Sequence, residues 1–373
     1  MYTGDIAFAK KYYHTIVNTL DKFYPSVTHP ETQLITKGVG ISDSYGDYAF
    51  LGRTGAVTYF NVLYVLALDN AAVLAKALGH KDDEARWSAR ARNTSDAVNT
   101  NRWDKVNGAY FDGQCGAEPC PQHAQDGNSI SIISGVANRY RAKSTLFYMT
   151  KNMARPYGNA FYDTDGLGTD FSQRVYAFMS YFEIQARFLT GEVGSALDQI
   201  RRMHGHMSRN DPGITMWEGI GPKGKPYQEG FTSMAHGWST GVVPALTNFV
   251  LGVRPTGPGF RTWTIKPHPG DLKWAKGEVP TPKGPIKVSW YSDADYDVFL
   301  LHAIVPAGTS GTISVPVWDP RLVVYVNTMP VWEKQVSRGI GAKFNKEDGY
   351  VSVDVESGTY VVSVGFAGLA PKS

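Results

Sequence analysis

Cysteine is scarce in this chain of 373 residues, which contains only Cys115 and Cys120. Two thiols are too few for a four-ligand zinc site of the cysteine-rich kind. Long apolar runs are missing too, because Asn61 already interrupts the longest apolar region, 60–68. A helix that spans a bilayer needs about 20 apolar residues. We therefore expect neither a cysteine-based zinc module nor a membrane partner.

A surplus of charge of one sign is also missing. Lys and Arg number 37 against 34 Asp and Glu, which leaves a net charge of +3. A protein that binds nucleic acid through bulk charge carries a larger positive surplus, so we expect no nucleic-acid partner. The sequence contains no P-loop or zincin motif either. Nucleotide-binding and zincin-type metalloprotease functions therefore have no support in the sequence.

Aromatic residues, in contrast, are abundant. They make up 13% of the chain, with nine Trp and 21 Tyr. Flat rings stack on sugar faces, but they also fill aromatic-rich cores, so this excess alone does not assign a function. The two cysteines lie close enough in sequence for a loop-closing disulfide, and two free thiols are the alternative. A disulfide would indicate an oxidising compartment. Together with the sequon Asn93-Thr94-Ser95, these features favour secretion.

Hydrophobic periodicity divides the chain in two. In residues 1–252 the apolar residues recur at helical spacing, and in residues 253–373 the period changes to two. The Gly- and Pro-rich stretch 252–259 is the predicted linker between the two domains. About eight helices are predicted, over 6–20, 55–78, 83–101, 127–140, 143–153, 171–189, 193–207 and 233–251. The second part predicts an antiparallel β-sandwich, with strands over 286–290, 298–305, 312–315, 322–326, 350–355 and 359–364.

Three stretches of sequence resemble glycoside hydrolase family 78, the α-L-rhamnosidases. The first is Gly213-Ile214-Thr215-Met216-Trp217-Glu218, and the second is Ser233-Met234-Ala235-His236-Gly237-Trp238-Ser239-Thr240-Gly241. The third is spread over the sandwich, in 274–277, 281–286, 305–309 and 356–360. Their order and spacing match the end of the family's catalytic domain and its C-terminal β-domain. The resemblance therefore covers nearly the whole chain.

This resemblance implies an (α/α)6 barrel of twelve helices that hydrolyses terminal α-L-rhamnosides with inversion. Inverting glycosidases use a carboxylic acid to protonate the leaving oxygen and a carboxylate to activate water. Glu218 matches the family's general base, and His236 matches the histidine that contacts the rhamnose ring. Trp217 is expected to wall the sugar site, and Trp238 either lines the same pocket or packs between helices.

A further element, Ser44-Tyr45-Gly46-Asp47-Tyr48, resembles a Gly-Asp-Trp segment that borders the family's active site. Tyr48 replaces the tryptophan of that segment, which weakens the case for a stacking role. Asp47 is a candidate for holding a sugar hydroxyl, or else a turn residue that bonds its own backbone. Asp43 is a weaker neighbouring candidate, and Glu229 is expected to be a solvated loop charge.

The family's general acid lies in an Asp-rich motif upstream of the helix that opens this chain, and no segment here matches it. Eight predicted helices instead of twelve agree with that reading, and the first residues resemble the interior of a longer protein. The expectation is a rhamnosidase-like glycosidase whose acid lies upstream, so that this chain alone has little activity on natural rhamnosides. The alternatives are a truncated, non-catalytic carbohydrate-binding remnant and another (α/α)6 enzyme, such as an unsaturated glucuronyl hydrolase or a trehalase-like enzyme.

The resemblance implies carbohydrate substrates, such as rhamnose-containing glycans or flavonoid glycosides, and no redox cofactor. Some relatives bind calcium, but the sequence has no complete EF-hand loop, because the run Asp293-Ala294-Asp295-Tyr296-Asp297 is followed by Val298 where such a loop requires glycine. We therefore expect no cofactor and no metal.

Overall fold

The computed structural model describes residues 1–36, 53–166, 173–211, 213, 215–338 and 341–366. The chain packs as two compact units. The helical unit is Ile6–Val242, and the β unit consists of Met1–Asp5 together with Val243–Ser373. Inside the β unit, the backbone N–H of Gly259 donates to the carbonyl of Met1 at 2.6 Å, which ties the first residues to this unit. The domain boundary at 252/253 stays a prediction.

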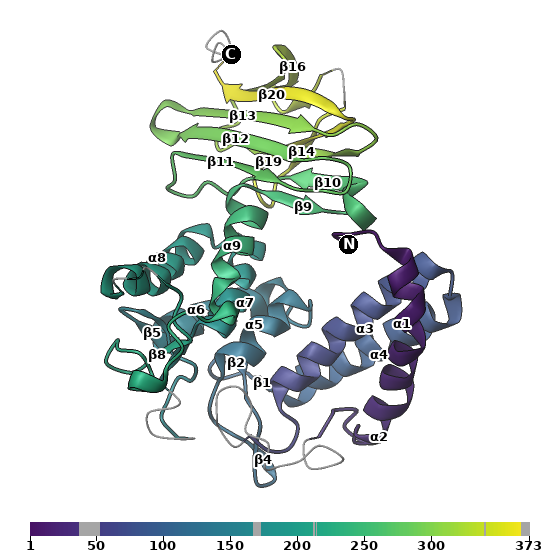
Figure 1. The fold of residues 1–373 in the computed structure, drawn as a ribbon, viewed down its shortest axis with the longest axis vertical. Helices are drawn as coiled ribbons and strands as arrows, with labels where there is room; N and C mark the ends of the chain where they lie inside the picture. The colour runs from purple at the N-terminus through teal and green to yellow at the C-terminus, as the bar shows by residue number, and fades with distance from the viewer. Residues whose placement is uncertain (37–52, 167–172, 212, 214, 339–340, 367–373) are drawn as a thin grey trace. The chain divides into compact units, whose positions relative to one another are not determined.

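The helical unit contains most of the helices expected from the sequence, with differences in extent (Figure 1). Short two-stranded ladders lie between several of them. The helices are α1 (Ile6–Asn18) with the π-helical turn η1 (Thr19–Phe23), α2 (Tyr24–Ser26), α3 (Thr58–Leu78), α4 (Lys81–Asn101), α5 (Gln125–Ile133), α6 (Arg139–Met153), α7 (Ala177–Leu189) and α8 (Val193–Asn210). The short strands are β1 (Trp103–Asp104), β2 (Ala109–Tyr110), β3 (Gln114–Cys115), β4 (Glu118–Pro119), β5 (Ala154–Arg155), β6 (Gly158–Asn159), β7 (Val175–Tyr176) and β8 (Gly219–Ile220).

Helices α3 and α4 form a hairpin at the core of this unit (Figure 1). Gly79 ends α3 in the left-handed conformation, with φ of 84°, which a glycine adopts at little cost. Three acidic residues in the first turn of α4 favour its N-terminus electrostatically. Trp87 of α4 and Val62 and Leu68 of α3 are fully buried in the same cluster. Apolar helix faces thus account for the core.

Helix α3 is also, by length and composition, the one described helix apolar enough to cross a membrane, with a mean hydropathy of 1.4. The sequence had shown no uninterrupted apolar run there, and the helix reaches this value although Asn61, Asp69 and Asn70 interrupt it. Many of its side chains belong to the core cluster of the helical unit. A buried core helix passes the same test, so the finding is weak evidence for a membrane span.

One predicted helix, 127–140, is wrong in extent. Helix α5 ends at Ile133, and α6 begins at Arg139. Gly135 between them has a φ of 73°, and the Asn138 side chain accepts the backbone N–H of Arg141 at 3.0 Å. The break therefore follows from a left-handed glycine and a helix N-cap, two local signals that the periodicity hides.

Two further predicted helices of this part, 171–189 and 233–251, also differ. The helix expected over 171–189 begins at Ala177, because Val175 and Tyr176 pair with Ile220 and Gly219 in a β7–β8 ladder. The helix expected over 233–251 is a succession of three turns of different pitch. They are the 3-10 helix η3 (Gly237–Gly241), α9 (Val242–Ala245) and the π-helical turn η4 (Leu246–Val250).

The β unit contains two sheets, of five and seven strands (Figure 1). Their orders are β18-β19-β14-β10-β9 and β11-β12-β13-β20-β15-β16-β17. The strands are β9 (Val253–Pro255), β10 (Thr262–Ile265), β11 (Trp274–Val279), β12 (Ile286–Asp293), β13 (Val298–Val305), β14 (Ser310–Pro316), β15 (Val323–Val326), β16 (Met329–Glu333), β17 (Val336–Ser337), β18 (Lys343–Asn345), β19 (Tyr350–Val355) and β20 (Gly358–Gly365). The remaining short helices are η2 (Glu229–Phe231) in the helical unit and η5 (Pro258–Phe260) and η6 (Ala294–Tyr296) in the β unit.

The predicted fold class is confirmed: about eight helices precede a layered β region. Two details are corrected. Strands β10 and β14 are parallel, whereas the sequence predicted a purely antiparallel sandwich. The predicted linker 252–259 contains β9, which pairs with β10.

Strand β12 shows why the period of two predicted these sheets. Its residues alternate between buried and more exposed positions, with Ile286, Val288 and Trp290 on the buried side. The Trp290 indole N–H donates to the Val250 carbonyl at 2.9 Å, so η4 packs with the sheet of its own unit.

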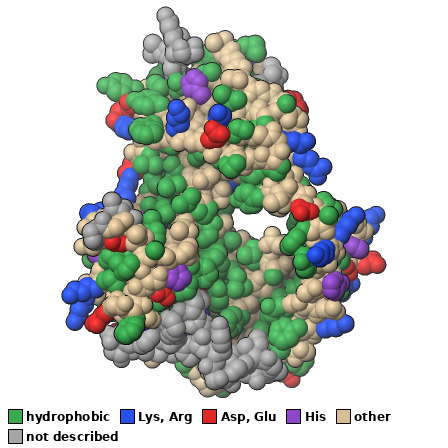
Figure 2. Space-filling view, viewed as in Figure 1, with side chains coloured by type: hydrophobic (Ala, Val, Ile, Leu, Met, Phe, Trp, Pro, Cys, Tyr) green, Lys and Arg blue, Asp and Glu red, His purple; other side chains and the backbone are tan. Residues whose placement is uncertain are grey.

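The surface of the molecule mixes charged side chains of both signs with hydrophobic ones (Figure 2). In the helical unit Phe8, Tyr140 and Phe147 are mostly exposed. Helices α1 and α3 also border an apolar groove of about 420 Å³. Some apolar side chains of the helical unit are thus left uncovered.

A buried histidine connects three segments of the helical unit. The His123 ring lies 2.7 Å from Asp163 through Nδ1 and 3.1 Å from Asp104 through Nε2, and the Tyr148 hydroxyl donates to Asp163 at 2.6 Å. Burial alone would raise the pKa of Asp163, but its hydrogen bonds with His123 and Tyr148 outweigh burial and lower that pKa. Burial would also raise the pKa of Asp104, but hydrogen bonds from the Asn107 side chain and the Val106 backbone outweigh burial and lower that pKa.

We expect this cluster to make folding sensitive to acid. A carboxyl group whose pKa is lower in the folded state stabilises the protein above its unfolded pKa, here 3.8, and loses that contribution as the pH falls through the folded pKa. Asp163→Asn should therefore lower the free energy of unfolding at pH 7 and flatten its decline below about pH 4. Denaturant unfolding at several pH values measures both effects. Asp96→Asn, on the exposed face of α4, is the control, and an equal decline in both variants would contradict the prediction.

Candidate active site

Two segments that the sequence singled out, 213–218 and 233–241, lie side by side over their described residues. The backbone N–H of Glu218 donates to the Ser233 carbonyl at 2.8 Å, and that of His236 donates to the Met216 carbonyl at 2.8 Å. The Ser239 hydroxyl donates to the Trp217 carbonyl at 2.6 Å. Hydrogen bonds thus fix the segment of Glu218 to the segment of His236.

The Glu218 carboxylate is held from one side and remains accessible. Its Oε2 accepts the backbone N–H of Ser233 at 3.1 Å, and its Oε1 lies 3.8 Å from Nε2 of His236. The two side chains are 17% and 29% exposed, respectively. A partly exposed carboxylate that is held by a backbone hydrogen bond suits a group that must accept a proton from a bound molecule.

Trp238 supports this pair rather than presenting a free face. Its ring stacks on His236, with centroids 4.3 Å apart, and on Phe178 of α7, with centroids 5.6 Å apart. Its indole N–H donates to the Glu218 carbonyl at 2.8 Å. Of the two settings foreseen for Trp238, the structure shows packing next to the candidate site. The ring fixes both the His236 imidazole and the Glu218 backbone.

Trp217 has a different setting from the sugar-site wall expected from the sequence. The residue is 2% exposed, and its indole N–H donates to Asp211 Oδ2 at 3.0 Å. Asp211 also accepts the backbone N–H of Gly213 at 2.8 Å and the Thr215 hydroxyl. The hydrogen bond from Thr215, followed by that from Gly213, lowers the pKa of Asp211. In this structure Trp217 is thus a buried support of the loop that carries Glu218.

The β7–β8 ladder positions Glu218 immediately before β8. Tyr227 packs against this ladder, because its backbone N–H donates to the Gly219 carbonyl at 3.2 Å and a Cβ on Gly219 would lie 3.1 Å from the Tyr227 ring. The Arg174 guanidinium lies over the ring, 4.8 Å from its centroid. Burial, and then the nearby Glu218 carboxylate, raises the pKa of Tyr227, so this phenol stays protonated beside Glu218.

Sequence reasoning missed Tyr227, Arg174 and Phe178. The signal for Tyr227 was its place in the short loop between the two motifs. Arg174 and Phe178 come from a distant part of the chain, and the sequence alone carried no signal that they reach this cluster.

Three residues expected near the site, Asp43, Asp47 and Tyr48, lie outside the described residues, so their roles stay predictions. Glu229 is exposed in η2, as expected for a solvated loop charge. Cys115 and Cys120, for which two states were open, are joined by a disulfide across the β3–β4 turn. Within the described ranges, the structure shows no group of three or more metal-ligating side chains.

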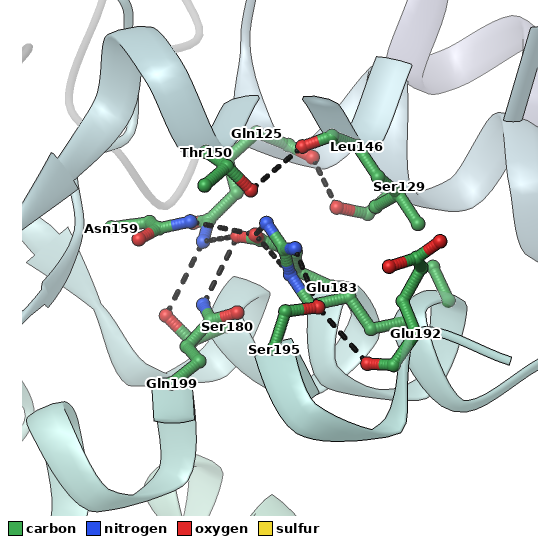
Figure 3. Close-up of polar contacts among 12 residues, drawn as sticks. Gln125, Ser129, Leu146, Thr150, Asn159, Ser180, Glu183, Glu192, Ser195 and Gln199 are labelled. Carbon is green, nitrogen blue, oxygen red and sulfur yellow. Dashed lines mark hydrogen bonds and ion pairs between the residues drawn. The ribbon is translucent and has the colours of Figure 1, made fainter. Parts of the chain in front are cut away.

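Helix α7 carries a buried carboxylate, Glu183, that ties four elements together (Figure 3). Glu183 Oε2 accepts the side-chain amides of Gln125 at 2.6 Å and Gln199 at 3.0 Å. Its Oε1 accepts Asn159 at 2.7 Å and the Arg187 guanidinium at 2.9 and 2.5 Å. The donors come from α5, α8, β6 and α7 itself. Because donors surround both oxygens and the residue is fully buried, we assign Glu183 to the scaffold.

Comparison with known proteins places these observations in a family. Residues 1–162 match the model of the bacterial alpha-L-rhamnosidase 6 hairpin glycosidase domain, and residues 252–329 match that of the bacterial alpha-L-rhamnosidase C-terminal domain. Together the two matches cover more than half of the chain. No curated protein matches the chain.

Solved structures of rhamnosidases are similar to the chain. The alpha-L-rhamnosidase from Dictyoglumus thermophilum matches 98% of the chain and 38% of its own length, with 19% identity and a TM-score of 0.71. The GH78 rhamnosidase of Bacillus sp. GL1 has 27% identity over 79% of the chain and 29% of its own length, with a TM-score of 0.62. The Streptomyces avermitilis alpha-L-rhamnosidase complexed with L-rhamnose has 18% identity over 97% of the chain and 31% of its own length, with a TM-score of 0.64.

The chain thus spans less than two fifths of the length of these relatives. Both family models and the folds of both parts agree with the resemblance found in the sequence. The chain belongs to the α-L-rhamnosidase family of glycoside hydrolases, with its six-hairpin helical domain and its C-terminal β domain.

Proposed function

We propose that this chain carries the general base of an inverting α-L-rhamnosidase, and that Glu218 is that base. The observation that supports this most directly is the geometry of Glu218, a 17% exposed side chain whose Oε2 accepts the Ser233 backbone N–H and whose Oε1 lies 3.8 Å from His236 Nε2. Family membership indicates the class of reaction. The Glu218 carboxylate provides the general base of that reaction but not its general acid.

In the proposed reaction, water donates a hydrogen bond to Oε1 of Glu218 and attacks the anomeric carbon of a terminal α-L-rhamnoside. As the new C–O bond forms, the proton of the water passes to Glu218. The glycosidic bond breaks on the opposite face, and the leaving oxygen takes a proton from a general acid. Glu218 then returns its proton to solvent. Attack from the face opposite the leaving group yields β-L-rhamnose as the first product.

The general acid is not the nearby Asp211. Hydrogen bonds from Thr215, Gly213 and Trp217 hold this carboxylate and lower its pKa, so Asp211 carries no proton at neutral pH. The acid therefore comes from outside the cluster around Glu218. A substrate whose leaving group is already a weak base, such as p-nitrophenol, needs little help from an acid and tests the base alone.

The aromatic group around Glu218 fits a pyranose site. His236 is partly exposed and rigidly stacked on Trp238, so its Nε2 offers a fixed hydrogen-bonding atom 3.8 Å from the carboxylate. We assign it to a hydroxyl of the rhamnose ring. The phenol of Tyr227 provides a protonated donor on another side of Glu218.

The experiment that tests this function is hydrolysis of p-nitrophenyl α-L-rhamnoside by the purified chain, followed by proton NMR of the fresh product. We expect slow release of p-nitrophenol and β-L-rhamnose as the first anomer. Release of α-L-rhamnose first would contradict the inverting mechanism. A folded chain that binds the substrate without any turnover would instead support the carbohydrate-binding remnant, and turnover of another pyranoside alone would support a different glycosidase.

A further inference from the structure

A small aromatic cavity lies in the β unit, formed entirely by residues of that unit. Its volume is about 140 Å³. The side chains that line it are Val317, Trp318, Pro320, Trp332, Gln335 and Phe344. None of these residues belongs to the cluster around Glu218, and hydrolysis as proposed above does not use them.

The cavity is built by strands at the edges of the two sheets. Phe344 lies on β18, the edge strand of the five-stranded sheet, and Trp332 lies on β16, next to the edge of the seven-stranded sheet. The two rings lie 5.4 Å apart and are tilted by 37°. Trp332 is 2% exposed and Trp318 is 39% exposed, so a buried indole forms the floor and a half-exposed indole forms the rim.

The rim is held in position before any ligand arrives. The Trp318 indole N–H donates to Asp297 Oδ1 at 2.5 Å, which fixes the ring. A ring that is already oriented loses less side-chain entropy when a ligand stacks on it. Preorganisation of this kind suits recognition of a small, weakly bound molecule.

The polar residue of the cavity lies in the hairpin turn between β16 and β17. Lys334 and Gln335 both have left-handed backbones, with φ of 50° and 61°, as in the type I′ turn that two-residue hairpins favour. Gln335, whose side-chain amide has one acceptor and two donors, lines the cavity together with apolar and aromatic side chains.

The chemistry of the cavity suits one face of a sugar ring. Its volume of about 140 Å³ is close to that of a protein cavity that takes up benzene, so a pyranose, which is larger, enters only in part and keeps its remaining hydroxyl groups in solvent. A pyranose presents apolar C–H groups on one face, which suit indole and phenyl walls, and hydroxyl groups at its edge, which suit an amide. We propose that this cavity of the β unit binds one pyranose residue of a saccharide, and that Trp318 and Gln335 provide the stacking face and the edge contact.

The test uses the full chain carrying Glu218→Gln, labelled with 5-fluorotryptophan and titrated with methyl α-L-rhamnopyranoside in 19F NMR. Each of the nine Trp residues contributes a resonance, and Trp318→Phe, Trp332→Phe and Trp274→Phe assign the three that matter. We expect the Trp318 resonance to shift with a dissociation constant of roughly 1 mM, near the weak end of specific binding. Trp274 is 68% exposed in the same unit, and its resonance should not move.

Two variants test the roles of the side chains. Trp318→Ala should weaken binding at the β unit at least tenfold, read from the resonance of Trp332. Gln335→Asn keeps a residue type that tolerates the left-handed backbone but withdraws the amide, and should also weaken binding about tenfold. Circular dichroism checks that both variants are folded.

The proposal is overturned if neither the Trp318 nor the Trp332 resonance moves with methyl α-L-rhamnopyranoside or methyl β-D-glucopyranoside up to roughly 50 mM, far above the expected dissociation constant. A shift with benzyl alcohol but not with either pyranoside would overturn it in favour of an apolar ligand. Because the readout is binding at the β unit, it is independent of whether the chain hydrolyses rhamnosides.

Discussion

Glu218→Gln is expected to reduce the turnover of p-nitrophenyl α-L-rhamnoside by about 10²–10⁴-fold, the range in which general acid–base catalysis typically contributes. Glutamine keeps the hydrogen bond from the Ser233 backbone and the volume of the side chain, but its amide cannot accept the proton of water. The Michaelis constant should change little, because the lost interaction belongs to the transition state. Steady-state kinetics of both proteins at neutral pH measure the effect.

Glu229→Gln is the matched control, since it makes the same chemical change at an exposed residue of the same segment. We expect it to keep the wild-type rate. Equal losses in the two variants would point to a general effect of the substitution on the loop. Unchanged turnover in Glu218→Gln would remove Glu218 from the mechanism and assign the base to another carboxylate.

Glu183→Ala should destabilise the protein by ~3–5 kcal/mol, the usual cost of removing one partner of a buried ion pair. The substitution leaves the Arg187 guanidinium buried without its carboxylate and also deprives three amides, on Gln125, Asn159 and Gln199, of their acceptor. Chemical denaturation followed by the helical circular dichroism signal measures the loss.

The control is Glu192→Ala, an exposed glutamate near the same helices (Figure 3). Its backbone carbonyl, which accepts the Ser195 hydroxyl at 2.9 Å, is retained in alanine, so a change within about 0.5 kcal/mol is expected. The double variant Glu183→Ala/Arg187→Ala should lose less than the sum of the single losses, because the two groups interact directly. Strict additivity would contradict the assignment of Glu183 to an ion-paired scaffold.

The sequence predicted the elements whose cause is local. Helix α3 and strands β12, β13 and β20 follow from apolar periods of 3.6 and 2. Helix α5 ends just before Gly135, whose backbone is left-handed. The apolar periodicity predicted a helix that continued past this residue. The parallel pairing of β10 with β14 joins strands far apart in the chain. No local pattern specifies such a partner, so the sequence could not predict it.

The residues of the candidate site were also predictable where the cause is local and unpredictable where it depends on distant segments. Glu218 and His236 were predicted because each lies in a short motif. The two motifs are close together in the sequence. The setting of Trp217 could not be predicted, because burial depends on what packs over the ring. Phe178 and Arg174 join the cluster only through the β7–β8 ladder, which pairs residues 175–176 with 219–220.

The assignment of Met1–Asp5 to the β unit has a mechanical consequence. The chain leaves the β unit after Asp5, forms the whole helical unit, and returns at Val243. A pulling force applied between Tyr2 and β20 therefore acts first within the β unit, and the helical unit lies outside the loaded path. Only after the first five residues detach would tension reach α1, so single-molecule extension should show rupture of the N-terminal segment before any helix unravels.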